Sequence, residues 1–241
     1  MNEDLRLRIL EVGKEKAFGH YGSTMSCLDT IKYLYDEVLT KDDIFILSKG
    51  HGAPALHAVL ESKGLNPPWT VHNEYDEKNG IKATTGSLGL GLPTAVGRAY
   101  AKKLKCEKGK VYCMVGDGEM QEGVIWESFN LIHKLNLTNF VLLIDYNKYQ
   151  AISSIKEIMD ESNTTFRKKL KAFGFKVYEI DGHSLDGLRF LKSLSWKINA
   201  VIVHTIKGKG IPYLEKNQST HVLYQSEKPE IFEEAIRSLK K

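Results

Sequence analysis

The sequence predicts an α/β fold, a doubly wound and mostly parallel sheet with helices on both faces. Residues 111–116 and 140–145 are nearly continuous apolar runs that end in Gly or Asp, as is typical of strands buried on both faces. The stretches between the expected strands carry apolar residues at helical spacing. Strand and helix in alternation, joined by right-handed crossovers, give a parallel sheet of this kind.

The expected elements follow in the order that this architecture requires. Strands are expected at 44–47, 111–116, 140–145, 176–180 and 200–204, with helices over 92–104, 126–135 and 229–239. No internal repeat, low-complexity tract or proline-rich linker interrupts the chain, which has six prolines. We therefore expect a single domain over residues 1–241.

Composition favours a soluble globular protein without a nucleic-acid partner. Against 30 acidic residues there are 34 basic ones, and the basic residues are scattered in pairs such as Lys102-Lys103. No apolar run approaches ~18 residues, and the charged residues that follow Met1 do not resemble a signal peptide. We expect no membrane association and a cytoplasmic location.

The three cysteines are Cys27, Cys106 and Cys113. They are too few and too irregularly spaced for a disulfide framework or a zinc site. A reducing compartment fits this usage.

Glycine-rich and polar loops gather beside the expected strands and helix starts. They cover residues 48–52, 86–91, 116–119 and 207–210. In a doubly wound sheet, ligands bind where loops leave the carboxyl ends of the strands. Four loops of one kind therefore predict one site.

Gly116-Asp117-Gly118 closes one buried strand, and Asn147 follows the next strand along the chain. Alone, the triplet is more often a tight turn than a site. Adjacent parallel strands, however, would bring Asp117 and Asn147 to the same edge of the sheet. A carboxylate and an amide oxygen there, with a nearby main-chain carbonyl, form half a shell for Mg²⁺ or Ca²⁺, which diphosphate oxygens can complete.

This pair of loops resembles the thiamine diphosphate motif, and the sequence around it resembles the transketolase family. The resemblance covers nearly the whole chain. Ordered matches lie at residues 19–22, 49–52, 84–89, 116–123, 126–127, 145–150, 181–183 and 205–210. It implies the thiamine diphosphate-binding fold.

The resemblance also implies roles for single residues. The divalent metal, Mg²⁺ or Ca²⁺, would be held by Asp117, Asn147 and the main-chain carbonyl of Tyr149. The residues implied around thiamine diphosphate are His51, Gly86, Ser87, Leu88, Gly116, Asp117, Gly118, Glu119, Asn147, Lys207 and His221. The residues implied in catalysis are His20 near the sugar, His51 and His221 facing the diphosphate, and Glu122, which would orient a partner's cofactor-activating glutamate.

Some of these residues have a structural interpretation as well. His20 could fill a turn, and Asp181-Gly182-His183 also predicts a turn before a helix capped at Ser184. Departures from the family pattern are Leu90, where Gln or His is usual, His72-Asn73-Glu74 in place of His-Pro-Glu, and a His221 that no glycine follows. A changed donor or acceptor sugar is compatible with these departures.

The family's pyrimidine-binding domain, which carries the activating glutamate, has no candidate region before Lys241. The resemblance is thus to the N-terminal subunit of a split transketolase. A C-terminal subunit would complete the site, in a two-plus-two heterotetramer that transfers a two-carbon ketol unit from a ketose or its phosphate to an aldose. Two alternatives stay open: a subunit of a related synthase or decarboxylating ligase acting on a 2-keto acid, and a non-catalytic binding protein. Intact Asp117 and Asn147 disfavour the second, and the histidine loops favour transfer over decarboxylation.

Overall fold

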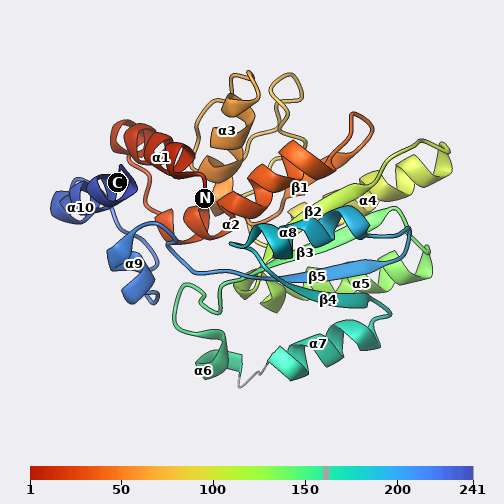
Figure 1. Cartoon of the computed structure of the whole chain (residues 1–241). Helices are drawn as coiled ribbons and strands as arrows, with labels where there is room; N and C mark the ends of the chain where they lie inside the picture. Colours follow the sequence, from red (N-terminus) through yellow and green to blue (C-terminus); the bar gives the residue numbers. More distant parts are fainter. Residues whose placement is uncertain (160–162, 241) are drawn as a thin grey trace.

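A five-stranded, fully parallel sheet forms the middle of the protein in the computed structural model, which describes residues 1–159 and 163–240 (Figure 1). The strand order is β1-β2-β3-β5-β4, and every neighbouring pair is parallel. The strands are β1 (Ile44–Leu47), β2 (Val111–Gly116), β3 (Phe140–Tyr146), β4 (Lys176–Asp181) and β5 (Asn199–His204). The predicted α/β fold with a parallel sheet is confirmed.

Helices and short helical turns connect these strands. The helices are α1 (Glu3–Lys16), α2 (Tyr21–Tyr33), α3 (Ala53–Ser62), α4 (Gly91–Leu104), α5 (Gly123–Lys134), α6 (Ile155–Met159), α7 (Asn163–Ala172), α8 (Leu185–Arg189), α9 (Pro212–Lys216) and α10 (Pro229–Leu239). The turns are the π-helical η1 (Leu34–Val38) and the 3-10 turns η2 (Gly50–Gly52), η3 (Gly118–Gln121) and η4 (Phe190–Ser193). Ser184 occupies the N-cap position of α8, but its side chain makes no capping hydrogen bond, so the expected cap is wrong in that detail.

Helices lie on both faces of the sheet (Figure 1), and an apolar core covers each face. Side chains alternate along each strand, so that Leu143 of β3 joins one core and Leu142 the other. The first core contains side chains of α1, α2, α3, α8 and α10, and the second contains side chains of α4, α5 and α7. Strands buried on both faces explain the continuous apolar runs in the sequence.

The carboxyl ends of the strands lie level with one another. Gly116 at the end of β2 pairs with Asp145 of β3, which in turn pairs with Val203 of β5. The residues that follow these strands therefore emerge along one edge. This register brings the polar loops of the sequence together.

Gly50 lets two of these loops touch. A Cβ atom at Gly50 would lie 2.4 Å from the carbonyl oxygen of Thr85 and 2.6 Å from the nitrogen of Gly86. Because main-chain atoms cannot yield at such distances, the position requires glycine. The loop after β1 is thereby held against the loop before α4.

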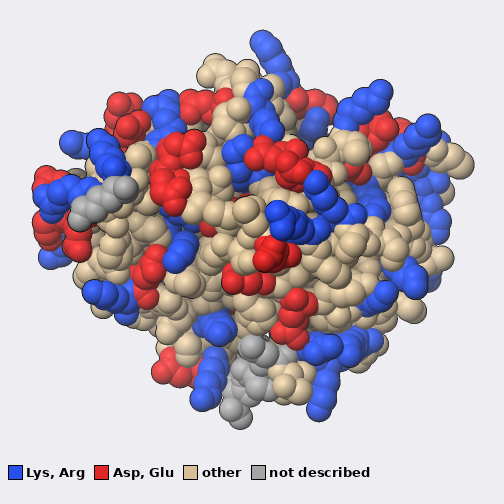
Figure 2. All heavy atoms as spheres, viewed as in Figure 1, with Lys and Arg blue, Asp and Glu red and all other residues tan. Residues whose placement is uncertain are grey.

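The surface seen in Figure 2 carries lysine and arginine interspersed with aspartate and glutamate. All three cysteines are free, with Cys27 and Cys113 buried and Cys106 exposed. Within residues 1–159 and 163–240, no helix is long and apolar enough to cross a membrane.

Candidate functional site

A cavity of about 350 Å³ opens at the carboxyl edge of the sheet. The predicted site residues that line it are His20, His51, Gly86, Leu88, Gly116, Asp117, Gly118, Glu119, Glu122, Asn147, Tyr149, Lys207 and His221. Ser87 differs, because it is exposed and is not among the residues that line the cavity. Residues that the sequence did not assign to the site also line it, namely Ser23, Lys49, His72, Gln121, Gln150, Ala151 and Ile152.

Asp117 and Asn147 lie side by side at this edge, both nearly buried. The Gly118 N–H donates to Asp117 Oδ1 at 2.8 Å, and the Lys148 N–H donates to Oδ2. Lys148 has a left-handed φ of 71°, and this turn lets the Tyr149 N–H donate to Asn147 Oδ1 at 3.1 Å. Burial, together with nearby Asp145, raises the pKa of Asp117 to about 7.

The raised pKa means that the surroundings of Asp117 do not fully stabilise its ionised carboxylate. A divalent cation at this point would stabilise it. Among the described residues no three His, Cys, Asp or Glu side chains gather as a metal site. A cation here would therefore depend on one carboxylate, the Asn147 amide oxygen, a main-chain carbonyl and the oxygens of its ligand, a donor set that suits hard cations such as Mg²⁺.

Directly beneath these groups lies a buried ion pair between Lys49 and Asp145. Both side chains are almost fully buried, with exposed fractions of 1% and 0%. Burial opposes the charge on each partner, but the pairing raises the pKa of Lys49 and lowers that of Asp145. Both groups are therefore charged at neutral pH.

Asp145 also accepts hydrogen bonds from the hydroxyl of Ser26, at 2.6 Å, and from that of Thr205. The amide nitrogen of Asn147 lies 3.5 Å from the same carboxylate. This contact fixes which way the Asn147 amide points, with its nitrogen toward Asp145 and its oxygen toward the Tyr149 N–H.

Lys207 is a second buried lysine, but its ammonium group is poorly paired. Among the described residues its hydrogen bond goes to the carbonyl oxygen of Gln150, at 3.5 Å, and it lies 5.7 Å from the centre of the Tyr149 ring. Burial lowers the pKa of Lys207 to about 8. A Cβ atom at Gly22 would lie 3.0 Å from Cγ of Lys207, so the lysine stem packs on the first turn of α2. A poorly paired buried ammonium that lines a cavity favours an anionic ligand.

Four histidines gather around the cavity. The ring of His20 lies 5.0 Å from that of His221, 5.7 Å from that of His51 and 6.3 Å from that of His72, centre to centre. Burial lowers the pKa of His20 to about 4, with a further effect from His221. Burial and nearby Lys49 hold the pKa of His51 well below its usual range. The rings of His20 and His51 are therefore neutral at pH 7, and each offers both a hydrogen-bond donor and an acceptor.

Glu119 joins three loops through its buried carboxylate. Oε1 accepts hydrogen bonds from the Ser48 hydroxyl at 2.6 Å and from the Gly89 N–H at 2.8 Å, while Oε2 accepts from the Gly116 N–H at 3.0 Å. The sequence resemblance implies only that Glu119 lies near the cofactor, and the structure adds this side-chain role. Glu122, which follows it, is exposed at the rim of the cavity.

Comparison with known proteins gives consistent matches. Residues 3–228 match the family described as the thiamine diphosphate binding domain of transketolase. The chain is 33% identical to the A subunit of the apulose-4-phosphate transketolase of Phocaeicola vulgatus, over 99% of this chain and 92% of that protein. It is 33% identical to the 6-deoxy-6-sulfo-D-fructose transketolase subunit SqwG of a Clostridium species, over 98% of this chain and 93% of that protein.

Solved structures are similar as well. The transketolase of Campylobacter jejuni superposes with a TM-score of 0.78 at 25% identity, over 99% of this chain and 41% of that one. The transketolase of Leishmania mexicana has a TM-score of 0.77 at 23% identity, with 99% and 40% covered, and shows the shared fold. The chain spans about two fifths of the length of these solved proteins.

Proposed function

The chain belongs to the transketolase family, and from that premise we propose that it is the diphosphate-binding subunit of a two-chain, thiamine diphosphate-dependent transketolase. It transfers a two-carbon ketol unit from a ketose, or its phosphate, to an aldose. One observation carries the proposal. In a single cavity, burial disfavours the negative charge of the Asp117 carboxylate, while the buried ammonium of Lys207 has no hydrogen bond shorter than 3.5 Å to any residue that the structure describes.

The two charges suit a metal diphosphate. Asp117, Asn147 and the Tyr149 carbonyl hold the cation, for which Mg²⁺ is the first choice and Ca²⁺ the second. Lys207, with His51 and His221, contacts the diphosphate oxygens. Bound thiamine diphosphate supplies the carbanion chemistry that breaks and forms a C–C bond next to a carbonyl.

A histidine outside the diphosphate contacts acts on the sugar. A neutral imidazole ring donates to and accepts from hydroxyl groups, and it holds or releases a proton as the oxygens of the sugar change charge. His20 is the first candidate, because its Nδ1 is buried and makes no hydrogen bond among the described residues. His72 lies beside it and extends the contact surface toward the outside.

A partner subunit supplies the pyrimidine-binding domain. Two relatives with similar length carry subunit names, which supports a two-chain enzyme. Glu122 lies at the rim, and Ile152, with 84% of its surface exposed, is a large apolar side chain next to the cavity. We propose one domain over 1–241, a two-plus-two assembly, phosphorylated sugars as substrates and a cytoplasmic location.

The test is an assay of ketol transfer between a ketose phosphate and an aldose phosphate, with thiamine diphosphate and Mg²⁺. The purified chain should be inactive alone and active with a polypeptide that carries the pyrimidine-binding domain. Robust transfer by the single chain would overturn the two-chain proposal. Turnover of a 2-keto acid without ketol transfer would favour a decarboxylating or ligating enzyme instead.

A further inference from the structure

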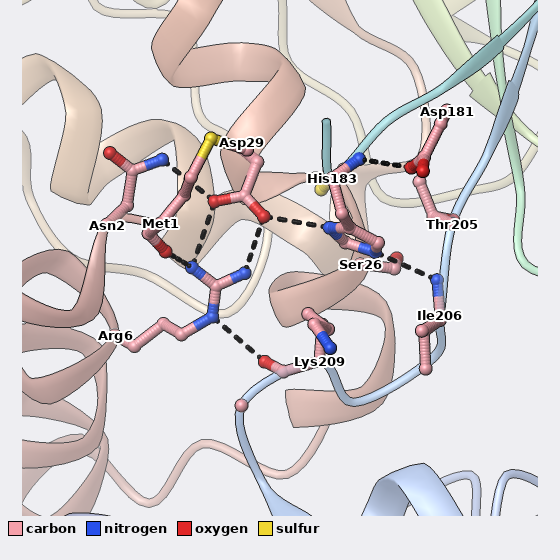
Figure 3. Close-up of polar contacts among 12 residues, drawn as sticks. Met1, Asn2, Arg6, Ser26, Asp29, Asp181, His183, Thr205, Ile206 and Lys209 are labelled. Atoms are coloured by element: carbon pink, nitrogen blue, oxygen red, sulfur yellow. Dashed lines mark hydrogen bonds and ion pairs between the residues drawn. The ribbon is translucent and has the colours of Figure 1, made fainter. Parts of the chain in front are cut away.

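Figure 3 shows a buried network centred on Asp29 of α2. It contacts the residues on both sides of Lys207, which lines the cavity, but none of the residues labelled in Figure 3 lines the cavity. Arg6 of α1 forms two hydrogen bonds with the Asp29 carboxylate, at 2.9 Å to Oδ1 and 2.8 Å to Oδ2. The amide of Asn2 donates to Oδ1 at 2.8 Å. Burial opposes the charge of Asp29, but hydrogen bonds from His183 and Arg6 hold its pKa below the usual range. The carboxylate is thus ionised and fully paired.

His183, in the loop after β4, connects this carboxylate to another loop (Figure 3). Its Nδ1 lies 2.8 Å from Asp29 Oδ2, and its Nε2 accepts the Ile206 N–H at 2.9 Å. Because Nε2 accepts, Nδ1 must carry the proton and donate it to Asp29. The contacts on both sides therefore select one neutral tautomer and one ring orientation.

The network holds the main chain on both sides of Lys207. His183 binds the N–H of Ile206, and Arg6 Nε donates to the carbonyl of Lys209 at 3.0 Å. Between them the Gly208 N–H donates to the carbonyl of Gly22 at 2.8 Å. The short segment that carries Lys207 is therefore fixed at three successive points.

We propose that His183 is a positioning residue for anion binding, since it fixes the main chain next to Lys207 so that the Lys207 ammonium faces the diphosphate site. This inference rests on the proposed function for its ligand, and on the geometry of the network for its mechanism. Lysine has a flexible four-carbon stem, so an ammonium that is held by weak contacts depends on its main chain for placement. Anchors on each side of Lys207 meet that need, and preorganisation of a charged group strengthens binding.

Two variants separate the two hydrogen bonds of His183, and a third serves as a control. In His183→Asn the amide nitrogen replaces Nδ1 and keeps the contact with Asp29, whereas the bond from the Ile206 N–H is lost. In His183→Gln the amide oxygen replaces Nε2 and keeps that bond. His204→Asn is the matched control, because His204 ends β5 only two residues before Ile206 but pairs with Glu179 at the surface.

The measurement is the Kd for thiamine diphosphate with Mg²⁺, by calorimetry on the full chain. His183→Asn should weaken binding by about threefold to tenfold, the loss expected for one hydrogen bond. His183→Gln should restore most of that loss, and His204→Asn should leave the Kd unchanged. Equal losses in the Asn and Gln variants would overturn the role assigned to the Ile206 contact.

A double-mutant cycle with Lys207→Met distinguishes positioning from general stability. If His183 acts through Lys207, His183→Asn should have no further effect on the Kd once the ammonium is gone. A loss of the same size in both backgrounds would overturn the proposal.

Amide hydrogen exchange tests the network without the ligand. His183→Asn should speed exchange at Ile206 and Gly208, whose N–H groups donate to His183 Nε2 and to the Gly22 carbonyl, and His183→Gln should not. If the unchanged chain binds no thiamine diphosphate, the proposed function fails, while faster exchange would still support the anchoring of this loop. Unaltered exchange at both residues would overturn the anchoring itself.

Discussion

The Asp29 network and the neighbouring cavity differ in how their buried charged groups are paired. In the network, Arg6 and His183 saturate the carboxylate of Asp29, and each partner has a defined geometry. In the cavity, burial raises the pKa of Asp117 and lowers that of Lys207, and the contacts that the described residues make with them do not offset it. The loop 205–210 runs from one region into the other. Buried charges in this protein are thus fully paired where the main chain is anchored, and incompletely paired where a ligand can complete them.

The largest effect, on stability, is expected when the ion pair between Arg6 and Asp29 is broken. Arg6→Leu leaves a buried carboxylate without its main partner, and we expect the free energy of unfolding in urea to fall by about 3 to 5 kcal/mol. The matched control is Arg189→Leu, since Arg189 pairs with exposed Asp186, and that change should cost about 0 to 1 kcal/mol. Similar losses in both variants would remove the distinction between the two regions.

The next largest effect is expected on cofactor affinity when the carboxylate of Asp117 is removed. Asp117→Ala should weaken metal-dependent binding of thiamine diphosphate by at least ~100-fold, because it removes the charged protein ligand of the cation. Asn147→Ala should have a smaller effect, since water can replace a neutral ligand. Asp186→Ala, at an exposed site, serves as the control in the same calorimetric titration. Unchanged affinity in Asp117→Ala would refute the assignment of the metal site.

Titration of Lys207 should make both the folding stability and the diphosphate affinity depend on pH, with an effect of intermediate size. Unfolded lysine keeps its proton up to about pH 10.5, whereas the folded chain releases that of Lys207 at about pH 8. Between these values the folded chain binds fewer protons, so this group makes stability rise with pH in that window. A bound anion reverses the preference and favours the protonated ammonium.

Diphosphate binding should therefore take up a proton near pH 8 and weaken as the pH rises above it. Lys207→Met should abolish the uptake and weaken binding at pH 7 by about tenfold. Calorimetry in buffers of different ionisation enthalpy measures the uptake. Lys216→Met is a control at the neighbouring α9, which lies outside the cavity. The same proton uptake in Lys207→Met would assign the titration to another group.

The smallest effect is expected at Ser87. Its side chain is exposed outside the cavity, so Ser87→Ala should change the Kd for thiamine diphosphate by less than about twofold, as for an ordinary surface substitution. A large loss would show that this loop rearranges around the ligand.

Much of the fold could be predicted because buried parallel strands leave a simple mark in the sequence. The strands at 44–47 and 111–116 have the predicted bounds, and the other three differ by one residue at one end. Those extra residues are Tyr146, Asp181 and Asn199, which still pair in the sheet. Polar groups at the ends of a strand do not extend the apolar run, so the run is shorter than the strand.

The position of the candidate site was predictable for a similar reason, since parallel strands end at one edge. The pairings within it were not. Lys49 lies in a loop that the sequence marked, but lysine is almost never fully buried unless it is paired, and nothing near it in the sequence indicates Asp145 as its partner. His183 likewise has the sequence context of a turn residue, and its contacts exist only once α2 and the loop after β5 are placed around it. Such contacts join distant segments and leave no local pattern.

The buried pair of Lys49 and Asp145 also restricts how this chain can change over time. A substitution at either position alone leaves an unpaired charge in the interior, and the resulting loss of stability is severe. The two positions should therefore vary jointly or not at all, and in a library of random variants single changes at 49 or 145 should be depleted. Any lineage that replaces the pair must pass through a poorly folded intermediate or acquire both changes at once.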